Sequence, residues 1–335
     1  MKKGASEENA RVVAKLLVNA DLAGHDSHGV YRIPSYVKFV EEGKVNPTAK
    51  GVLEVDRESV GLFNGEWGFG QVVATEAMKL AIKKGREYGT SAVGIMHSGH
   101  IGRMADYCLM AVEEDMIGMI MANANPWVAP FGGAERIFNP CPFGIGIPAG
   151  KQRPFVLDIS MSVCAAGKIQ AKKARNEKKL PEGWIIDKDG NASTNIEDFF
   201  GGGSILPLGG SVAYKGYGLA FMIDILAGAL TGHGCGSTDA YRFGNSQNGV
   251  FMIAVDISRF RDIETFKMKM DEVICRVKKS KKAPGVKEIM IPGEPESLEE
   301  EKRLRDGILI PDTVWHEISD VASRLGVTIP LPLQA

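Results

Sequence analysis

Strand-like and helix-like stretches alternate along almost the whole chain, and this alternation is the strongest constraint on its fold. Short apolar runs are followed by amphipathic runs whose apolar residues recur every three or four positions. Interleaved elements of this kind predict an α/β or α+β class. Strands are predicted at 51–65 (a hairpin), 91–98, 117–125, 144–148, 154–160 and 248–260, with a strand and loop at 286–296. Helices are predicted at 6–24, 30–43 (broken near Pro34), 70–89, 102–116, 214–232, 263–280, 296–307 and 311–326.

The glycine pattern argues against the standard dinucleotide-binding fold. That fold places G-x-G-x-x-G directly after an early strand, where backbone N–H groups meet a pyrophosphate. The glycines of GEWGFGQ (65–71) have a different spacing and an aromatic pair between them. The phosphate-loop sequence G-x-x-x-x-G-K-[ST] and the zinc motif H-E-x-x-H are also missing. With 40 glycines in 335 residues, the chain still needs many tight turns and close backbone approaches, as small-ligand enzymes do.

Charge and cysteine content argue against several classes of partner and compartment. A formal net charge of −1 gives no electrostatic support for binding nucleic acid or a membrane surface. The five cysteines form no C-x-x-C pair and are odd in number, which favours reduced thiols in a cytoplasmic protein. The start, MKKGASEENARVVAKLL, lacks the apolar core of a secretory signal. Because no uncharged apolar run reaches about 18 residues, no membrane span is predicted.

Four of the six histidines lie in two short stretches, HDSHGVYR and MHSGHIGR. The first stretch follows the end of a predicted helix, so we expect it to form a loop. The imidazole of His28 can exchange a proton near neutral pH, and Arg32 presents a planar fork suited to a carboxylate. A histidine beside an arginine fits a substrate that has a hydroxyl group next to a carboxylate. The aspartate and serine of this stretch could equally cap helix ends, which these residue types do routinely.

The second histidine stretch follows a predicted strand and precedes a helix, the position at which open α/β sheets bind ligands. Its two histidines, His97 and His100, could bind a metal, with Asp158 as a further ligand from the end of another strand. Histidines three apart without a nearby third ligand are a weak zinc pattern, so a packed polar role is favoured for His97. Asp158 could instead orient a histidine or cap the segment after it.

A lysine in a glycine loop, YKGYG, stands at the start of a long apolar helix. Backbone N–H groups and the ammonium group of Lys215 could form a site for a phosphate. A turn with a solvated lysine explains the same pattern, so the loop alone leaves both interpretations open.

Seven stretches, spread in order from about residue 7 to the C-terminus, carry a resemblance to a known family: ADLAGHDSHGVYRIPSYV, GHIGRMADYCLMAVEEDMIGM, VAPFGGAERIFNPCPFGIGIP, PFVLDIS, KLPEGWIIDKDG, LPLGG…YKGYGLAFMIDILAGALTG and IMIPGEP. Together they resemble the malate/L-lactate dehydrogenase family of the second type. The family also holds ureidoglycolate, sulfolactate and diketogulonate dehydrogenases and imino-acid reductases. The resemblance implies a mixed α/β fold that is not the standard dinucleotide-binding one, a homodimer, and interconversion of small 2-oxo and 2-hydroxy acids with NAD or NADP.

The resemblance also implies a division of the chain and roles for single residues. Residues 1–50 with 296–335 would form a helical part for substrate and dimer contacts, and residues 51–295 would bind the nicotinamide cofactor. The implied catalytic set is His28 as proton donor and acceptor, Ser27 and Asp158 as its relay partners, and His100, which holds the catalytic role in some members. The implied substrate contacts are Arg32, which binds the carboxylate, and His100. The implied cofactor contacts are His100, Gly102, Arg103, Ala124, Asp158, Ile159, Ser160, Lys215, Gly216, Gly293, Glu294 and Pro295. No metal is implied.

The chain departs from the family pattern at a few positions. Asn139–Pro142 replaces the usual G-T-N-P, Ala124 stands where some members have a serine, and Arg103, which could face a phosphate, replaces a small residue. The family's first helix is also missing from the N-terminus. The substrate and the choice between NAD and NADP therefore stay open, with a cyclic imino-acid reductase or a ureidoglycolate-type dehydrogenase as alternatives. Two other hypotheses are a non-catalytic small-ligand binder and a metal-dependent hydrolase or lyase that uses His25, His28, His97, His100 and Asp158.

Overall fold

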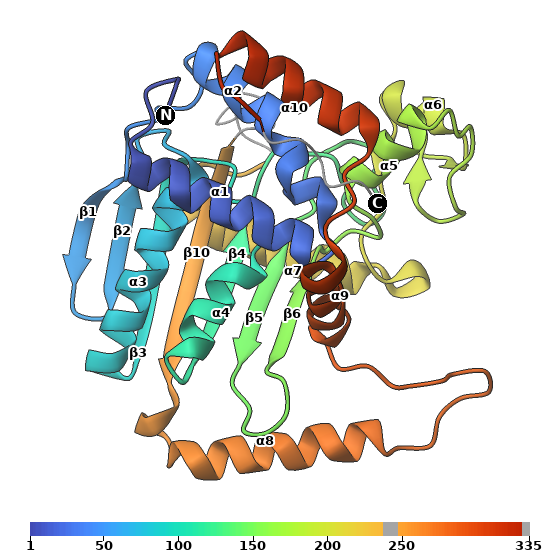
Figure 1. Cartoon of the computed structure of the whole chain (residues 1–335). Helices are drawn as coiled ribbons and strands as arrows, with labels where there is room; N and C mark the ends of the chain where they lie inside the picture. Colours follow the sequence, from blue (N-terminus) through green and yellow to red (C-terminus); the bar gives the residue numbers. More distant parts are fainter. Residues whose placement is uncertain (237–246, 330–335) are drawn as a thin grey trace.

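A mixed sheet of seven strands forms the centre of the computed structural model, which describes residues 1–236 and 247–329 (Figure 1). The strand order is β1-β2-β3-β10-β4-β5-β6. Strands β2, β3, β4 and β6 run in the same direction, because β10 and β5 are each antiparallel to both of their neighbours. This sheet with its helices confirms the predicted α/β class. The strands are β1 (Val52–Arg57), β2 (Val60–Asn64), β3 (Thr90–Gly99), β4 (Met116–Ala122), β5 (Phe143–Ile147), β6 (Phe155–Ile159) and β10 (Gln247–Asp256).

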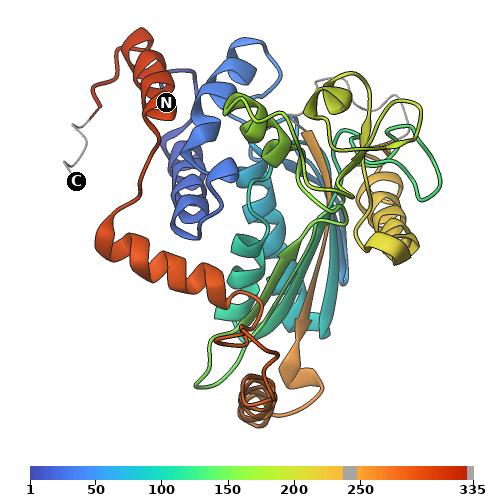
Figure 2. The ribbon, with the colours of Figure 1, turned by 90° about the vertical axis from the view of Figure 1, so that its right-hand side faces the viewer.

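Helices α3 (Gly70–Tyr88) and α4 (Ala105–Glu113) cover one face of this sheet (Figures 1 and 2). Small residues let α3 lie close to the strands, since a Cβ atom at Gly85 would lie 2.5 Å from the Met116 side chain. The main core fills the space between these helices and the strands, and each large apolar side chain buried there contributes about 1.5–3 kcal/mol to folding. Its fully buried residues include Met78, Val93, Ile120 and Met252.

A second core lies on the other side of the large sheet, around α7 and a small sheet of order β8-β7-β9 (Figure 2). The pattern of the sequence predicted α7 but neither α5 nor this sheet. Strands of two residues are too short to show the alternation that identifies a strand. The elements are α5 (Ala166–Ala174), β7 (Ile185–Ile186), β8 (Ala192–Ser193), α6 (Ile196–Phe200), β9 (Ser204–Ile205) and α7 (Tyr214–Asp224), which continues as a π-helical turn (Ile225–Ala229).

Helices from the two chain ends lie together: α1 contacts α9, and α2 contacts α10 (Figure 1). Ser6 caps α1, and its hydroxyl accepts a hydrogen bond from the N–H of Asn9 at 3.1 Å. The break predicted near Pro34 does not occur within the next helix. Pro34 lies in the first turn of α2, where a missing N–H costs no hydrogen bond. Residues 330–335 of the predicted helical part lie outside the described residues. The helices are α1 (Glu7–Leu22), α2 (Ile33–Glu41), α9 (Glu294–Asp306) and α10 (Asp312–Arg324).

Helix α8 (Ile263–Lys278) lies along the foot of the sheet (Figure 1). Its Asp271 carboxylate accepts three backbone N–H groups of the β5–β6 turn, from Gly150, Lys151 and Gln152, at 3.0, 2.7 and 3.1 Å. The strand predicted after α8 is wrong, since this segment is a loop that leads into α9. No helix within the described residues is long and apolar enough to cross a membrane.

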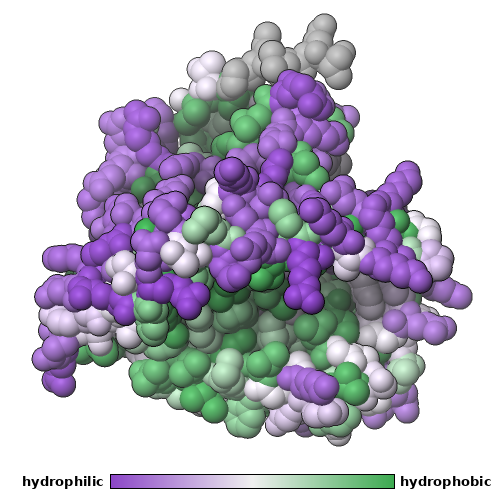
Figure 3. Space-filling view, turned by 90° about the horizontal axis from the view of Figure 1, so that it is seen from below, coloured by the Kyte–Doolittle hydropathy of each residue, from purple (hydrophilic) through white to green (hydrophobic). Residues whose placement is uncertain are grey.

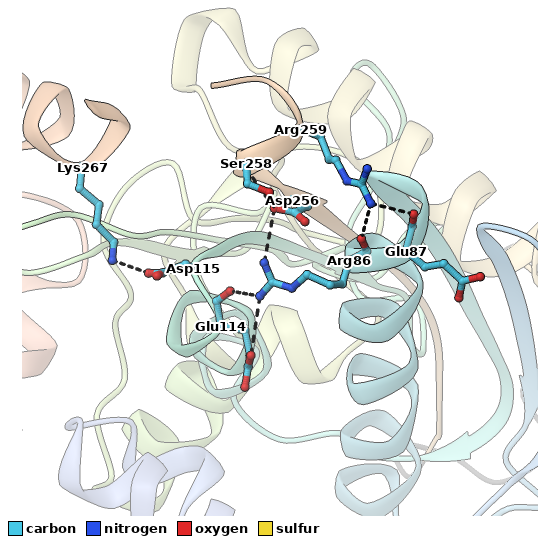
Figure 4. Close-up of polar contacts among 8 residues, drawn as sticks. All are labelled: Arg86, Glu87, Glu114, Asp115, Asp256, Ser258, Arg259 and Lys267. Atoms are coloured by element: carbon cyan, nitrogen blue, oxygen red, sulfur yellow. Dashed lines mark hydrogen bonds and ion pairs between the residues drawn. The ribbon is translucent and has the colours of Figure 1, made fainter. Parts of the chain in front are cut away.

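A polar network closes the lower edge of the sheet (Figure 4). Arg86, in the last turn of α3, contacts the Asp256 carboxylate at the end of β10 and donates to the backbone carbonyl of Glu114 before β4. Lys267 of α8 pairs with Asp115 at 2.6 Å. These contacts join two helices to the strand ends, so the lower edge is occupied by structural interactions.

Candidate active site

The carboxyl ends of β2, β3, β4 and β6 meet at the upper edge of the sheet, and the predicted site residues gather there. His100 follows directly after β3, and Asp158 is the next-to-last residue of β6. Asn248, at the start of β10, joins two of these strand ends. Its side chain accepts the N–H of Ile101 at 3.1 Å and donates to the carbonyl of Asn123 at 2.7 Å. The loops after β3 and β4 are thereby held side by side.

Two histidines from distant parts of the sequence stack against each other at this edge. The ring centroids of His28 and His100 are 5.5 Å apart, and the ring planes make an angle of 28°. His28 lies in the first of two 3₁₀ turns, Asp26–His28 and Val30–Arg32, that connect α1 to α2. The fold therefore joins the two histidine stretches of the sequence in one site.

Each ring is oriented by a hydroxyl group at its Nδ1 atom. The hydroxyl of Ser27 lies 3.0 Å from Nδ1 of His28, and that of Tyr36 lies 2.8 Å from Nδ1 of His100. Gln71 donates to the Tyr36 oxygen at 2.7 Å, so the Tyr36 hydroxyl can direct its own hydrogen to His100. In this arrangement His100 carries its proton on Nε2 and can donate a hydrogen bond there.

Burial keeps both imidazoles neutral. Burial, with smaller contributions from the charges of Arg32, His25 and Arg103, lowers the pKa of His28 to about 3. Burial likewise holds the pKa of His100 well below its usual value, with smaller contributions from Arg32 and His28. A neutral imidazole can accept a proton, and an anion bound beside Arg32 would offset the cationic charge that opposes this step.

These shifts predict that stability falls in acid in a way that depends on His28. Below about pH 6.5 the unfolded chain binds a proton at this residue, whereas the folded protein does not until about pH 3. Folding free energy is therefore lost as the pH falls from about 6.5, at about 1.4 kcal/mol per pH unit for each such histidine. We expect the melting temperature of His28→Gln to fall less between pH 7 and pH 5 than that of the wild type.

The matched control is His316→Gln, which changes an exposed histidine on α10. It should leave the pH dependence of the melting temperature as in the wild type, measured by calorimetry. Equal pH dependence in His28→Gln and the wild type would contradict the burial of a neutral imidazole.

Asp158 contacts the backbone rather than a histidine. One of its oxygens accepts the N–H groups of Met104 and Ala105, at 3.0 and 2.9 Å, and so caps the N-terminus of α4. The capping role considered for this residue is therefore present, but for a helix that precedes it in the sequence. Asp158 thereby fixes the loop that runs from His100 into α4.

Other predicted cofactor residues come from segments that pack along β6. Gly293 has a φ of 91°, and a Cβ atom there would lie 2.8 Å from the Cβ of Val156 in β6. Gly216, in the first turn of α7, packs still more closely, since a Cβ atom there would lie 2.1 Å from the carbonyl oxygen of Leu208. The N–H of Leu208 donates to the carbonyl of Met161, just after β6, at 2.9 Å. The remaining predicted residues lie after β3 (Gly102 and Arg103), after β4 (Ala124), at the end of β6 (Ile159 and Ser160) and in the first turns of α7 (Lys215) and α9 (Glu294 and Pro295).

Arg103 is the buried cation of this region. Its Nη1 atom lies 3.6 Å from a carboxylate oxygen of Asp106, and its side chain is 8% exposed. Within residues 1–236 and 247–329, the buried Nε atom of Arg103 has no hydrogen-bond partner. A buried guanidinium with an unused donor, in the loop that Asp158 holds, is chemically suited to a phosphate group.

Pattern reasoning missed several residues of the site. Tyr36 and Gln71 orient His100, yet each occupies an ordinary helical position with no motif around it. The first turn of α5 also borders the site, since a Cβ atom at Gly167 would lie 4.0 Å from that of Ser27. His97 lies apart from the stacked pair and packs on Trp67, with ring centroids 5.0 Å apart. No group of three or more histidine, cysteine or acidic side chains able to hold a metal occurs in the described part of the chain.

Comparison with known proteins agrees with this fold. The family model described as malate/L-lactate dehydrogenase matches residues 1–319. Malate dehydrogenase from Pyrococcus horikoshii is 43% identical over 336 residues, covering 97% of this chain and 91% of that protein. Malate/(S)-sulfolactate dehydrogenase from Methanothermus fervidus is 39% identical over 329 residues, covering 97% and 94%. The solved structure of the Pyrococcus horikoshii enzyme superposes with a TM-score of 0.88 at 40% identity, covering 98% of this chain and 91% of that one.

Fold, site and relatives together define a dehydrogenase of the 2-hydroxy-acid class. Within that class, the chain belongs to the malate/L-lactate dehydrogenase family.

Proposed function

We propose that the protein interconverts a 2-hydroxy acid and a 2-oxo acid by hydride transfer, with His28 as the proton donor and acceptor. The observation that carries this proposal is the neutral, stacked pair of His28 and His100 beside Arg32. Hydride chemistry at a hydroxyl-bearing carbon needs a base for the hydroxyl proton, a donor to the same oxygen and a cation for the carboxylate. These three side chains supply one group of each kind.

Arg32 is proposed to bind the substrate carboxylate. Its Nε donates to the carbonyl of Ser27 at 2.7 Å, which leaves the two terminal nitrogens for a carboxylate. The same bond ties Arg32 to the turn that carries His28. The base and the carboxylate-binding group therefore move as one unit, which fixes the carboxylate relative to the reacting hydroxyl group.

His28 is proposed to take the proton of the C2 hydroxyl during oxidation and to return it during reduction. Ser27 holds the ring through Nδ1, so Nε2 is the atom that exchanges the proton. His100 donates from its Nε2 to the same substrate oxygen and stabilises the developing charge. Asp158 contributes by holding the loop that carries His100, and not by a relay through Ser27.

A nicotinamide cofactor, NAD or NADP, is proposed to bind among the segments around β6. When bound, it accepts or supplies the hydride at C2 of the substrate. The donor set fits a dinucleotide, because Arg103 has an unused buried nitrogen and glycines let the backbone approach closely. The residues proposed to hold it are His100, Gly102, Arg103, Ala124, Asp158, Ile159, Ser160, Lys215, Gly216, Gly293, Glu294 and Pro295. In this arrangement the helices of the chain ends form the substrate part, and residues 51–295 form the cofactor part.

Malate and oxaloacetate are the substrate pair that we favour, because the relatives at 43% and 39% identity carry malate in their names. The test is a panel of oxaloacetate, pyruvate, sulfopyruvate and a cyclic imino acid, each with NADH and with NADPH, followed by absorbance. Oxaloacetate should be reduced with the highest kcat/KM. Absence of turnover with every 2-oxo acid, in protein that binds NADH, would contradict the proposal and favour a non-catalytic binder.

A homodimer is proposed from a broad apolar surface on the side of the sheet away from α3 and α4. Figure 2 shows that α7 covers only the upper part of this side, and Figure 3 shows hydrophobic residues gathered below a band of hydrophilic ones. One partly exposed apolar row crosses the sheet in register: Ala92, Ile253, Met119, Ile145 and Leu157. Helix α7 and its π-helical end add the exposed residues Leu219, Phe221, Met222, Ile225 and Leu230. Apolar surface of this extent is typical of an interface between subunits.

Leu219→Glu is expected to turn the dimer into a monomer, because it places a charge in the apolar surface of α7. Leu304→Glu is the matched control, since Leu304 is 66% exposed on α9, outside this surface. Mass measured by light scattering should be twice 36.2 kDa for the wild type and the control, and 36.2 kDa for Leu219→Glu. A dimeric Leu219→Glu would place the interface elsewhere, and a monomeric wild type would contradict the homodimer.

The cytoplasm is the proposed compartment. Cys108, Cys141 and Cys164 are buried free thiols, and burial raises the pKa of each. Such thiols act as small apolar side chains and fit a reducing environment.

A further inference from the structure

The turn that carries Ser27, His28 and Arg32 is held at two points by residues of the flanking helices α1 and α9. It comprises two short 3₁₀ turns, and only a few hydrogen bonds lie within it. Such a segment needs external contacts to hold a side chain in one place. Asp21, in the last turn of α1, supplies one contact, and Arg303, near the end of α9, supplies the other.

Asp21 lies directly beneath the backbone of the turn. Its side chain accepts the N–H of Val30 at 2.9 Å, and the residue is 3% exposed. A Cβ atom at Gly29 would lie only 1.7 Å from the other carboxylate oxygen. Position 29 must therefore be glycine for the turn to sit on this carboxylate, which explains why a glycine directly follows His28.

Arg303 joins α9 to the other side of the same turn. Its Nη1 atom donates to the carbonyl of Asp21 at 2.6 Å and to the carboxylate of Asp26 at 2.5 Å. Its Nε is fixed by Glu299, one turn earlier in α9, at 2.6 Å. The Arg303 side chain is only 17% exposed, so these contacts are partly shielded from solvent and salt.

A further contact from α9 reaches this turn close to its start. Glu296 lies 3.6 Å from Nε2 of His25. Helix α9 thus contacts the turn through both Glu296 and Arg303, while the N-terminus of α9 belongs to the proposed cofactor site. The catalytic turn is held between the end of α1 and one face of α9.

We propose that Asp21 and Arg303 are positioning residues that hold the turn carrying His28 and Arg32 in its productive place. The proposal rests on the function proposed above for those two side chains. Without these contacts, His28 and Arg32 are no longer held in a fixed position. Displacements of about 1 Å at a reacting group cost roughly 10²-fold in rate.

Arg303→Met is the first test, with Arg305→Met as its matched control. Arg305 lies on the same helix and pairs with the adjacent Asp306 at 2.7 Å. In Arg303→Met, hydrogen exchange of the amides of residues 24–32 should become faster. The value of kcat/KM for the 2-oxo acid should fall roughly 10- to 100-fold, while the Kd for NADH stays unchanged.

The exchange and kinetic measurements separate two kinds of failure. Unchanged exchange in Arg303→Met would overturn the positioning role even if the wild type has no dehydrogenase activity. Faster exchange with unchanged kcat/KM would show that the position of the turn does not matter for turnover, and would also overturn the proposal. Arg305→Met should match the wild type in both measurements.

Asp21→Ala and Asp21→Asn form the second test. Asp21→Ala removes the acceptor for Val30, so exchange in the turn should become faster and kcat/KM should fall. Asp21→Asn keeps an oxygen that can accept this N–H and should restore most of the lost kcat/KM. Burial raises the pKa of Asp21 to about 6, so its charge at neutral pH is a cost to folding, and Asp21→Asn should melt no lower than the wild type. Equal loss of kcat/KM in both variants would contradict the acceptor role.

Discussion

Replacement of His28 by asparagine is expected to lower kcat by about 10²–10⁴-fold, the usual contribution of a positioned acid or base. The imidazole is half-buried and neutral, and Ser27 orients it, so its loss removes the group that accepts the hydroxyl proton. The cofactor loops around β6 do not depend on this side chain. The Kd for NADH, measured by fluorescence, should therefore stay within about twofold of the wild-type value while steady-state turnover is lost.

Two further asparagine variants make this result specific. His100→Asn should also lower kcat but should keep the pH dependence of kcat/KM, because His100 is proposed to donate a hydrogen bond without exchanging its proton. His97→Asn should behave as the wild type, since His97 packs against Trp67, and asparagine tolerates its left-handed backbone, with φ of 51°. If His100→Asn loses the pH dependence and His28→Asn keeps it, the roles of the two histidines must be exchanged.

Replacement of Arg32 by lysine is expected to cost about 2–4 kcal/mol of transition-state binding, or roughly 30- to 1,000-fold in kcat/KM for the 2-oxo acid. The arginine performs two tasks, because its Nε donates to the carbonyl of Ser27 while its terminal nitrogens remain for the substrate. A lysine ammonium is a point donor without the planar fork that a carboxylate matches in two bonds. The main effect should be a higher KM for the 2-oxo acid.

Arg276→Lys provides the comparison, since Arg276 is an exposed arginine on α8, away from the upper edge of the sheet. It should leave KM and kcat unchanged. An Arg32→Lys enzyme with wild-type KM for its 2-oxo acid would show that another cation binds the carboxylate.

Local patterns predicted most of the elements and failed where tertiary contacts decide. The N-cap Ser6, the helix of α3 and the β1–β2 hairpin follow from residues that are close in sequence. The order of the large sheet does not, because β10 inserts between β3 and β4 from far along the chain. The strand predicted after α8 is wrong for the same reason: an apolar run becomes a strand only where a neighbouring strand is available to pair with it.

The candidate site could likewise be predicted from the sequence only in part. The chemistry of His28 and Arg32 could be inferred from their types and spacing, because a proton-exchanging group and a carboxylate-binding group suit one another. The stacking of His28 on His100 could not, since it depends on how α1, α2 and β3 are placed. Tyr36, Gln71, Asp21 and Arg303 carry no motif, and only their contacts in the folded protein give them a role.

The most direct test of the central proposal is the transfer of a labelled hydrogen. Malate deuterated at C2 is incubated with the oxidised cofactor, and the reduced nicotinamide is analysed by mass spectrometry. The proposed reaction moves the C2 hydrogen to the cofactor as hydride while His28 takes only the hydroxyl proton, so the reduced cofactor should carry the deuterium. Reduced cofactor without deuterium would contradict direct hydride transfer, and the absence of any reduced cofactor with each 2-hydroxy acid of the panel would contradict the dehydrogenase activity itself.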